Sequence, residues 1–136
     1  MRFMILVKAT KESEAGVMPT EELMTAMADY HEQLAKAGIL VDGNGLHPSS
    51  KGWRIKWAGG KKAIVGGPFA EIRELVAGFT IINVRSREEA LEWTKRFPNP
   101  TLADGEIEIR QMFELEDFGQ TEAVGRFREM DVGVRQ

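Results

Sequence analysis

The chain of 136 residues has the length of one domain, and a composition 43% hydrophobic and 29% charged indicates a globular rather than a disordered protein. It contains no cysteine, which excludes disulfides, thiol nucleophiles and thiolate metal sites and is compatible with the cytoplasm. The net charge of −3 gives no electrostatic reason to expect nucleic acid or an acidic membrane as a partner. The apolar run at residues 3–7 is too short for a signal peptide or for a membrane helix of about 20 residues.

The first third of the chain predicts a strand, a loop and a helix. Residues 3–7 are continuously apolar, so we expect a strand with both faces buried. Residues 8–18 are polar and predict a loop. A helix is expected to begin near Thr20, with acids in its first turn, and to end at Gly38. Its apolar stripe consists of Leu23, Met27, Tyr30 and Leu34.

The middle third predicts a short extended segment and a hairpin. Residues 39–41 are extended, and the following Asp-Gly-Asn-Gly at 42–45 predicts a turn. Residues 53–57 then alternate between an apolar and a basic face, and Gly59-Gly60 is typical of a two-residue hairpin turn before residues 63–65.

The last third predicts a strand, a helix, a strand and a tail. Residues 78–84 form a second strand that is apolar on both faces, and Ser86 with Glu89 is the pattern of a capping box. This second helix should end at Pro98. Residues 106–113 alternate, with isoleucines on one face and charged residues on the other. Four apolar residues could pin the tail to a surface: Phe118, Val124, Phe127 and Met130.

This order of elements predicts an α+β fold, a ferredoxin-like sandwich with an antiparallel sheet and two helices on one face. Two strands are apolar on both faces, yet two helices can cover only one face of the sheet. The simplest cover for the second face is the same face of another copy, so we expect a homodimer joined sheet to sheet. The alternative is that the hairpin and the C-terminal tail fold back over that face.

A rigid turn interrupts the chain at residues 65–71, VGGPFAE. Gly66 and Gly67 permit backbone angles closed to other residues, and Pro68 fixes one φ and lacks an amide donor. The turn therefore directs an aromatic side chain, Phe69, and a carboxylate, Glu71.

Four motifs in order resemble one known family: RFMILV, AGILVDGNGLHPSS, GGPFAEIRELVAGFTII and GEIEIRQMFELEDFG. The chain resembles the YCII-related family, also called the DGPF-domain family, over residues 1–119. The resemblance implies a dimeric α+β barrel. We expect residues 120–136 to form a C-terminal extension that packs on the domain or on the dimer partner. The aspartate of the family's DGPF signature is replaced here by Gly66.

Three residues are candidates for acid–base chemistry. His47 lies in a Gly- and Pro-rich loop, where it could act near neutral pH, or it could cap backbone groups or face solvent. His31 lies at the edge of the helix stripe, facing a groove or making a structural hydrogen bond. Glu71 could serve as a base or histidine partner, or as a first-turn acid of a short helix.

A second group could bind a ligand: Trp53, Arg54, Gly67, Pro68 and Phe69. The tryptophan could line an apolar pocket while Arg54 attracts an anion, and the glycine-proline turn would form one wall. Aromatic residues between basic ones also suggest single-stranded nucleic acid, which the acidic net charge opposes. The third alternative is core packing with a solvated basic face.

The histidines and carboxylates match no usual metal-ligand spacing, and no dinucleotide or P-loop motif occurs, so we expect neither metal nor cofactor. The first hypothesis is a small cytoplasmic enzyme that uses His47 or His31 with Glu71 on a small organic molecule, in a pocket between sheet and helices. The alternative is a dimer that binds a small molecule without turnover, or a purely structural dimerisation module. A histidine within hydrogen-bond reach of a carboxylate would favour the enzyme.

Overall fold

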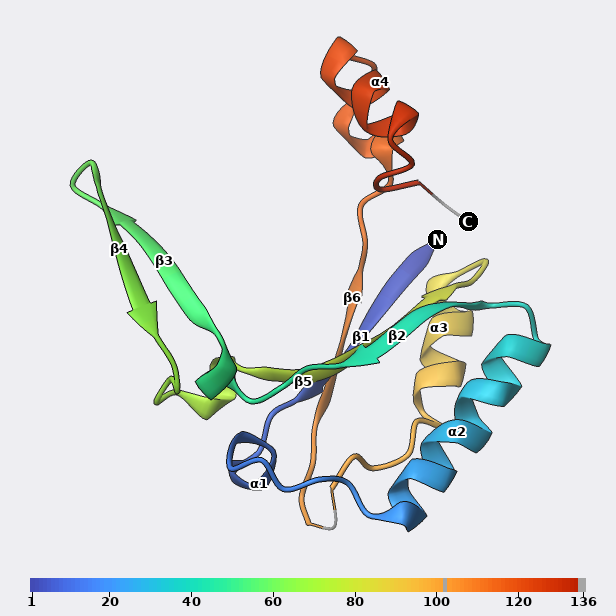
Figure 1. Cartoon of the computed structure of the whole chain (residues 1–136). Helices are drawn as coiled ribbons and strands as arrows, with labels where there is room; N and C mark the ends of the chain where they lie inside the picture. Colours follow the sequence, from blue (N-terminus) through green and yellow to red (C-terminus); the bar gives the residue numbers. More distant parts are fainter. Residues whose placement is uncertain (102, 135–136) are drawn as a thin grey trace.

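A computed structural model describes residues 1–101 and 103–134 as a four-stranded antiparallel sheet with helices on one face (Figure 1). The strands lie in the order β2-β5-β1-β6, which confirms the ferredoxin-like α+β fold. The strands of this sheet are β1 (Arg2–Lys8), β2 (Leu40–Gly45), β5 (Val76–Asn83) and β6 (Ile107–Gln111). The other elements are α1 (Lys11–Glu14), α2 (Glu21–Lys36), η1 (Ser49–Lys51), β3 (Trp53–Ala58), β4 (Lys61–Gly66), η2 (Ile72–Glu74), α3 (Arg87–Thr94), η3 (Leu115–Phe118) and α4 (Glu122–Glu129).

Helix α2 begins and ends where the sequence predicts, and α3 begins as predicted after Ser86 but ends at Thr94, four residues before Pro98. Thr20 caps α2 by accepting a hydrogen bond of 3.1 Å from the amide of Leu23, and Gly38 follows the helix at φ +75°. Ser86 caps α3 by accepting from the amide of Glu89 at 3.1 Å. The Glu89 carboxylate accepts from the amide of Arg85 rather than from Ser86, so the capping box is displaced by one residue.

The core lies between the sheet and helices α2 and α3. Ile5 at the centre of β1 pairs with Thr80 on β5 and with Ile109 on β6. Ile5 and Ile82 from the sheet meet Leu34 from α2, and these three side chains are fully buried. Side chains alternate along each strand, so the strand residues between the core-facing positions point to the opposite face of the sheet.

The sequence Asp-Gly-Asn-Gly at 42–45 is not a turn, contrary to our expectation. It forms most of β2 and pairs with β5, and neither Gly43 nor Gly45 has a positive φ. A Cβ on Gly43 would lie 3.4 Å from the carbonyl oxygen of Phe79, and one on Gly78 would lie 3.0 Å from that of Asn44. The glycines therefore allow β2 to approach β5 closely, which is a use of glycine inside a strand.

The face of the sheet away from the helices is apolar at its centre. The register places Met4 opposite Ile81 and Leu6 opposite Phe79 on this face, and all four side chains are half-buried. Glu108 and Arg110 on β6 flank them. In the part of the chain that the structure describes, helices α2 and α3 cover only the other face (Figure 1). We name this surface the open face.

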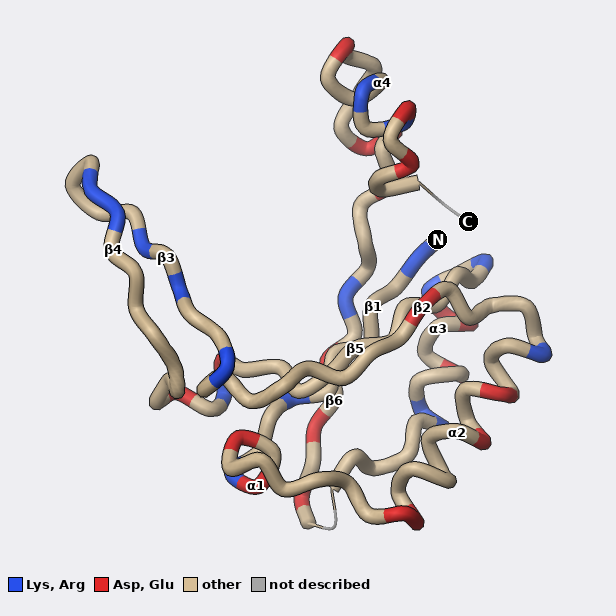
Figure 2. The backbone as a smooth tube through the Cα atoms, viewed as in Figure 1, with Lys and Arg blue, Asp and Glu red and all other residues tan. Residues whose placement is uncertain are grey.

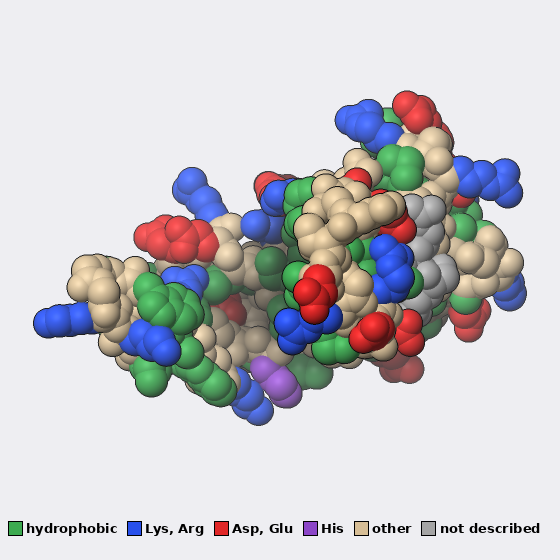
Figure 3. Space-filling view, turned by 90° about the horizontal axis from the view of Figure 1, so that it is seen from above, with side chains coloured by type: hydrophobic (Ala, Val, Ile, Leu, Met, Phe, Trp, Pro, Cys, Tyr) green, Lys and Arg blue, Asp and Glu red, His purple; other side chains and the backbone are tan. Residues whose placement is uncertain are grey.

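The hairpin of β3 and β4 projects from the sandwich as a separate two-stranded sheet (Figure 1). Its turn has both Gly59 and Gly60 at positive φ, as expected. Trp53 and Trp57 are 67% and 70% exposed, so core packing is the wrong explanation for the tryptophans within this chain. The hairpin does not fold back over the open face of its own chain. The backbone view marks several Lys and Arg positions along this arm (Figure 2). The space-filling view shows hydrophobic side chains beside Lys and Arg on it (Figure 3).

The tail after β6 contains η3 and α4 and rises from the end of the sheet (Figure 1). Of the four apolar residues expected to pin it, Val124 is buried, whereas Phe118, Phe127 and Met130 are exposed. The tail is attached at its root by Arg2, whose guanidinium donates to both carboxylate oxygens of Glu114 at 3.3 Å and to the carbonyl oxygen of Gly133 at 3.1 Å. No helix among the described residues is long and apolar enough to cross a membrane.

We expect the Arg2→Ala substitution to lower the free energy of unfolding by about 3–5 kcal/mol, because it leaves the buried Glu114 without its cation. The control is Lys95→Ala, which removes an exposed ion pair with Glu92 and should cost about 0–1 kcal/mol. Urea denaturation followed by circular dichroism measures both changes. Equal effects of the two substitutions would contradict the anchoring role of Arg2.

Candidate functional site

The glycine-proline turn packs against η1 at the base of the hairpin. The amide of Gly67 donates to the carbonyl oxygen of Gly52 at 3.0 Å, and the Gly67-Pro68 peptide bond is cis. A Cβ on Gly67 would lie only 1.8 Å from the carbonyl oxygen of Ser49. Any residue other than glycine would therefore force two backbone segments apart.

Ser49 and Glu14 complete the attachment of the turn. The amide of Phe69 donates to the Ser49 hydroxyl at 3.0 Å, and the Ser49 amide donates to the Glu14 carboxylate at 2.9 Å. The Ser49 hydroxyl also donates to the second oxygen of this carboxylate. We name Glu14, Ser49, Gly67 and Phe69 the turn cluster. It joins α1, η1 and the end of β4 through charge-assisted hydrogen bonds.

Sequence reasoning missed Glu14, because it falls in a stretch that predicted only a loop. The signal for the helical turn was present, since Thr10 and Ser13 form a reciprocal capping box around α1. Nothing in the sequence indicates that Glu14 meets Ser49, which lies 35 positions later.

The five predicted ligand-binding residues divide between two faces of the hairpin. The Arg54 guanidinium carbon lies 3.9 Å from the centroid of the Phe69 ring, and Arg54 forms an ion pair of 3.6 Å with Glu74. Arg54, Gly67 and Phe69 are therefore adjacent, with Pro68 exposed beside them. Trp53 points from the opposite face of the same strand, because side chains alternate along β3.

His31 lies between α2 and the sheet, with hydrogen bonds at both ring nitrogens. Nδ1 is 2.7 Å from the carbonyl oxygen of Met27, which can only accept, so Nδ1 carries a proton. In the neutral ring Nε2 then accepts from the hydroxyl of buried Thr80 at 2.8 Å. The rings of Tyr30 and Phe97 meet the imidazole edge-to-face at centroid distances of 5.7 and 6.2 Å. These contacts hold His31 in one orientation.

The other two acid–base candidates do not join it. His47 and Glu71 are exposed, and the side chain of neither has a hydrogen bond or ion pair with another described residue. Within residues 1–101 and 103–134, therefore, no histidine lies within hydrogen-bond reach of a carboxylate. The arrangement that would favour an enzyme is not assembled in this chain alone.

Tyr30 is a further buried titratable group beside His31. Burial raises the pKa of Tyr30 to about 12, against an opposing effect of the positive charge on Arg96. The phenol is therefore neutral at physiological pH, and its hydroxyl donates to the carbonyl oxygen of Trp93 at 2.7 Å. Its role is to join α2 to α3 rather than to transfer a proton.

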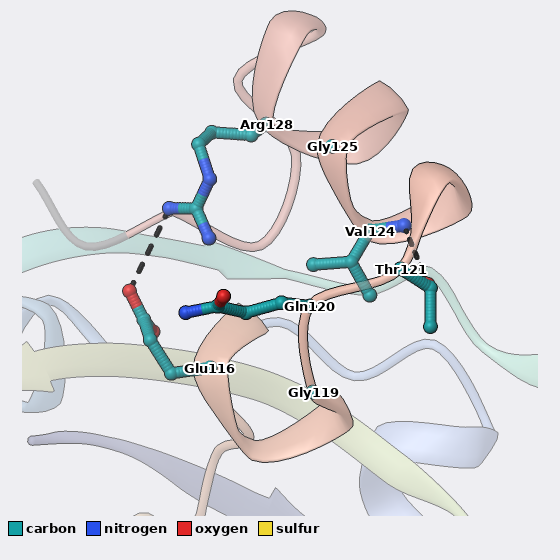
Figure 4. Close-up of a pocket in the computed structure, with 7 residues that line it drawn as sticks. All are labelled: Glu116, Gly119, Gln120, Thr121, Val124, Gly125 and Arg128. Atoms are coloured by element: carbon teal, nitrogen blue, oxygen red, sulfur yellow. Dashed lines mark hydrogen bonds and ion pairs between the residues drawn. The ribbon is translucent and has the colours of Figure 1, made fainter.

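Two open hollows lie on the tail rather than between sheet and helices. The larger, of about 480 Å³, is bounded by η3 and α4, and it contains an ion pair of 3.6 Å between Glu116 and Arg128 (Figure 4). The smaller, of about 350 Å³, lies beside Phe113 and Asp117. Neither is lined by a residue that the sequence predicted for the site. No group of three or more described His, Asp or Glu side chains is placed to hold a metal ion.

We expect Gly67→Ala to lower the free energy of unfolding by about 1–3 kcal/mol, because the added methyl group overlaps the Ser49 carbonyl. The neighbouring Gly66→Ala is a matched control, since its Cβ would have no atom within 4 Å and should leave stability unchanged or slightly higher. Thermal unfolding measures both variants. A harmless Gly67→Ala would show that the turn does not pack against η1.

Comparison with known proteins gives a family but no reaction. The YCII-related domain family matches residues 1–116. An uncharacterized protein of Rhizobium meliloti (strain 1021) is 27% identical over 92 residues, which cover 68% of this chain and 74% of that protein. The name of that protein states no activity. The family match spans most of the chain and agrees with the strand order and helix placement, and we conclude that the chain belongs to the YCII-related domain family.

Proposed function

We propose that the chain acts as a cytoplasmic homodimer that binds a small organic molecule without converting it. The observation that supports this proposal is the open face, where Met4, Leu6, Phe79 and Ile81 form an apolar centre that α2 and α3 leave uncovered. Two such faces, stacked by a two-fold axis, would remove these side chains from water. The absence of cysteine is compatible with the reducing cytoplasm.

The borders of the open face supply polar groups for a ligand. Arg110 and Glu108 on β6 form an ion pair of 3.3 Å, in which Arg110 is 70% exposed, and Asp42 on β2 lies opposite Ile81. An apolar centre with a few charged groups at its edge is the usual composition of a small-molecule site. In the proposed dimer, the ligand lies between the two sheets, with its polar groups toward Arg110 or Asp42.

Binding without turnover agrees with the positions of the acid–base candidates. His31 has both ring nitrogens in hydrogen bonds within the chain, and exposed His47 has no carboxylate partner among the described residues. A general base normally needs a free lone pair within reach of a substrate proton. These histidines therefore support a structural role for His31 and leave His47 without an orienting group.

An enzyme is the second candidate, and the pairing of His31 with Thr80 favours it. The Thr80 hydroxyl donates to Nε2 at 2.8 Å, which is the geometry of a hydroxyl next to a base. Gly43 lies over both groups, since its Cβ would be 3.6 Å from Thr80 Oγ1 and 3.8 Å from Nε2. A small substrate would have to enter past this glycine.

We expect Phe79→Arg to convert the dimer to a monomer, because it places two charges in the apolar centre of the interface. Leu91→Arg is the control: it makes the same addition on α3, in the helical layer away from the open face, and should leave the dimer intact. Sedimentation velocity measures the oligomeric state, and circular dichroism checks that both variants fold. Phe79→Ala provides a milder variant, for which we expect weaker dimerisation. A monomeric wild-type protein would contradict the proposal.

Native mass spectrometry of protein purified without added ligand distinguishes a protein that only binds a small molecule from one that converts it. We expect a small organic mass on the dimer that is released on denaturation and rebinds unchanged to fresh protein. Conversion of the released molecule by wild-type protein, abolished in both His31→Asn and Thr80→Val, would instead establish the enzyme. A dimer that carries no small molecule would contradict the ligand-binding role.

A further inference from the structure

The apolar face of the hairpin is exposed in a way that a two-stranded arm rarely tolerates. Trp53, Ile55 and Trp57 share this face with Ile64, which pairs with Ile55 and is 75% exposed. The hairpin pairs with no strand of the four-stranded sheet. Isolated two-stranded hairpins are only marginally stable in water, so this arm needs a cover that residues 1–101 and 103–134 of its own chain do not provide.

The tail carries a second exposed apolar surface. Phe113 is 67% exposed and packs on Phe118, with a ring-centroid distance of 4.8 Å. Phe127 and Met130 are exposed on α4 and just after it. The hollows of about 480 and 350 Å³ lie on this same tail. Interface tryptophans typically fill hollows of this kind on the facing subunit.

The two surfaces carry opposite charge. Residues 51–66 include basic residues and no acidic one, whereas residues 113–134 are mainly acidic (Figure 2). The basic residues of the hairpin are Lys51, Arg54, Lys56, Lys61 and Lys62. The tail contains Glu114, Glu116, Asp117, Glu122, Glu129 and Asp131 against Arg126 and Arg128. Complementary charges around apolar centres favour one pairing of surfaces over others.

These surfaces stand apart within one chain, and both roots are held. The turn cluster attaches the base of the hairpin to η1 and α1, and Arg2 holds the tail through Glu114 and Gly133. Figure 1 shows the two arms separated, with neither lying against α2 and α3. The hairpin therefore cannot reach the tail of its own chain without breaking one of these attachments.

We propose that the hairpin of each copy packs on the tail of the other copy in the homodimer. This inference rests on the proposed homodimer and adds a specific pair of surfaces to it. A two-fold axis makes every contact twice. If the hairpin of one copy packs on the tail of the other, the reverse contact also forms, and both hairpins and both tails are covered. The hairpin tryptophans enter the hollows beside Phe113 and α4, and the lysines of the hairpin meet the acids of η3 and α4.

The exposed area suits this role. The two tryptophans alone present roughly 300 Å² to solvent, since an aromatic side chain buries up to about 250 Å². With the isoleucines, the face is comparable to the largest apolar patches on monomeric proteins, roughly 300–600 Å². Each chain would add its tail and its open face to this area, and a standard interface covers roughly 800 Å² per partner.

Cysteine cross-linking tests the pairing cleanly, because the natural chain has no cysteine. Ile64→Cys and Met130→Cys are made in separate full-length chains, at positions 75% and 60% exposed, so neither should disturb folding. The two variants are mixed, allowed to exchange subunits and treated with a short bismaleimide. We expect a covalent dimer containing one chain of each variant, identified by the mass of the cross-linked peptide pair.

The controls separate this inference from the proposed homodimer. Leu91→Cys mixed with Ile64→Cys should give no cross-link, because Leu91 lies on the helical layer. A wild-type dimer in sedimentation velocity, together with no link between positions 64 and 130, would overturn the arm pairing and leave the homodimer standing. A cross-link between two copies of Ile64→Cys would likewise overturn it, as would a link within a single chain that carries both Ile64→Cys and Met130→Cys. A monomeric wild-type protein would overturn both proposals.

A charge swap gives a second readout that does not depend on cysteine geometry. Lys61→Glu with Lys62→Glu should weaken the dimer at least tenfold, and adding Glu122→Lys with Glu129→Lys on the tail should restore it. The dissociation constant is measured by sedimentation at low ionic strength, where surface charges are least screened. Failure of the tail substitutions to rescue dimerisation would contradict the contact between hairpin and tail.

Discussion

The apolar side chains on both faces of β1 and β5 impose the main constraint on this molecule. Phe3, Ile5 and Ile82 build the core against α2, and the intervening Met4, Leu6, Phe79 and Ile81 form the open face. Two helices cannot cover both faces of the sheet. The fold therefore has a complete core, but the apolar centre of the open face is left without a covering layer. The homodimer that we propose follows directly from this imbalance.

A second constraint is the rigid attachment of the hairpin. Gly67 packs on the Ser49 carbonyl so closely that no side chain fits, and Glu14 binds both the amide and the hydroxyl of Ser49. The stacking of Arg54 on Phe69 continues this packing to the first strand of the hairpin. Of the residues that the sequence suggested for a ligand pocket, Arg54, Gly67 and Phe69 thus connect the arm to the body of the protein. They set the direction in which the tryptophans of the arm project.

The acid–base candidates show why a fold does not establish a reaction. His31 is held between Met27 and Thr80, whereas His47 and Glu71 face solvent from two different loops. Membership of the YCII-related family supports the architecture, and the relative from Rhizobium meliloti is itself uncharacterized. The chemistry of this protein therefore depends on the ligand and the side chains that meet at the open face and at the two arms, where a second copy would add its own side chains.

The sequence by itself determined the order of the main elements, both ends of α2, the start of α3, the Gly59-Gly60 turn and the two-sided strands, because these depend on local spacing and capping. It also predicted the alternating faces of the hairpin correctly, although their exposure was not visible from the pattern. Only the tertiary structure decided that residues 42–45 form a strand, since glycines there serve close packing on β5 rather than a turn. Likewise, only the structure joined Glu14 to Ser49, Arg2 to Glu114 and His31 to Thr80, because contacts between residues far apart in the chain leave no periodic signal in the sequence.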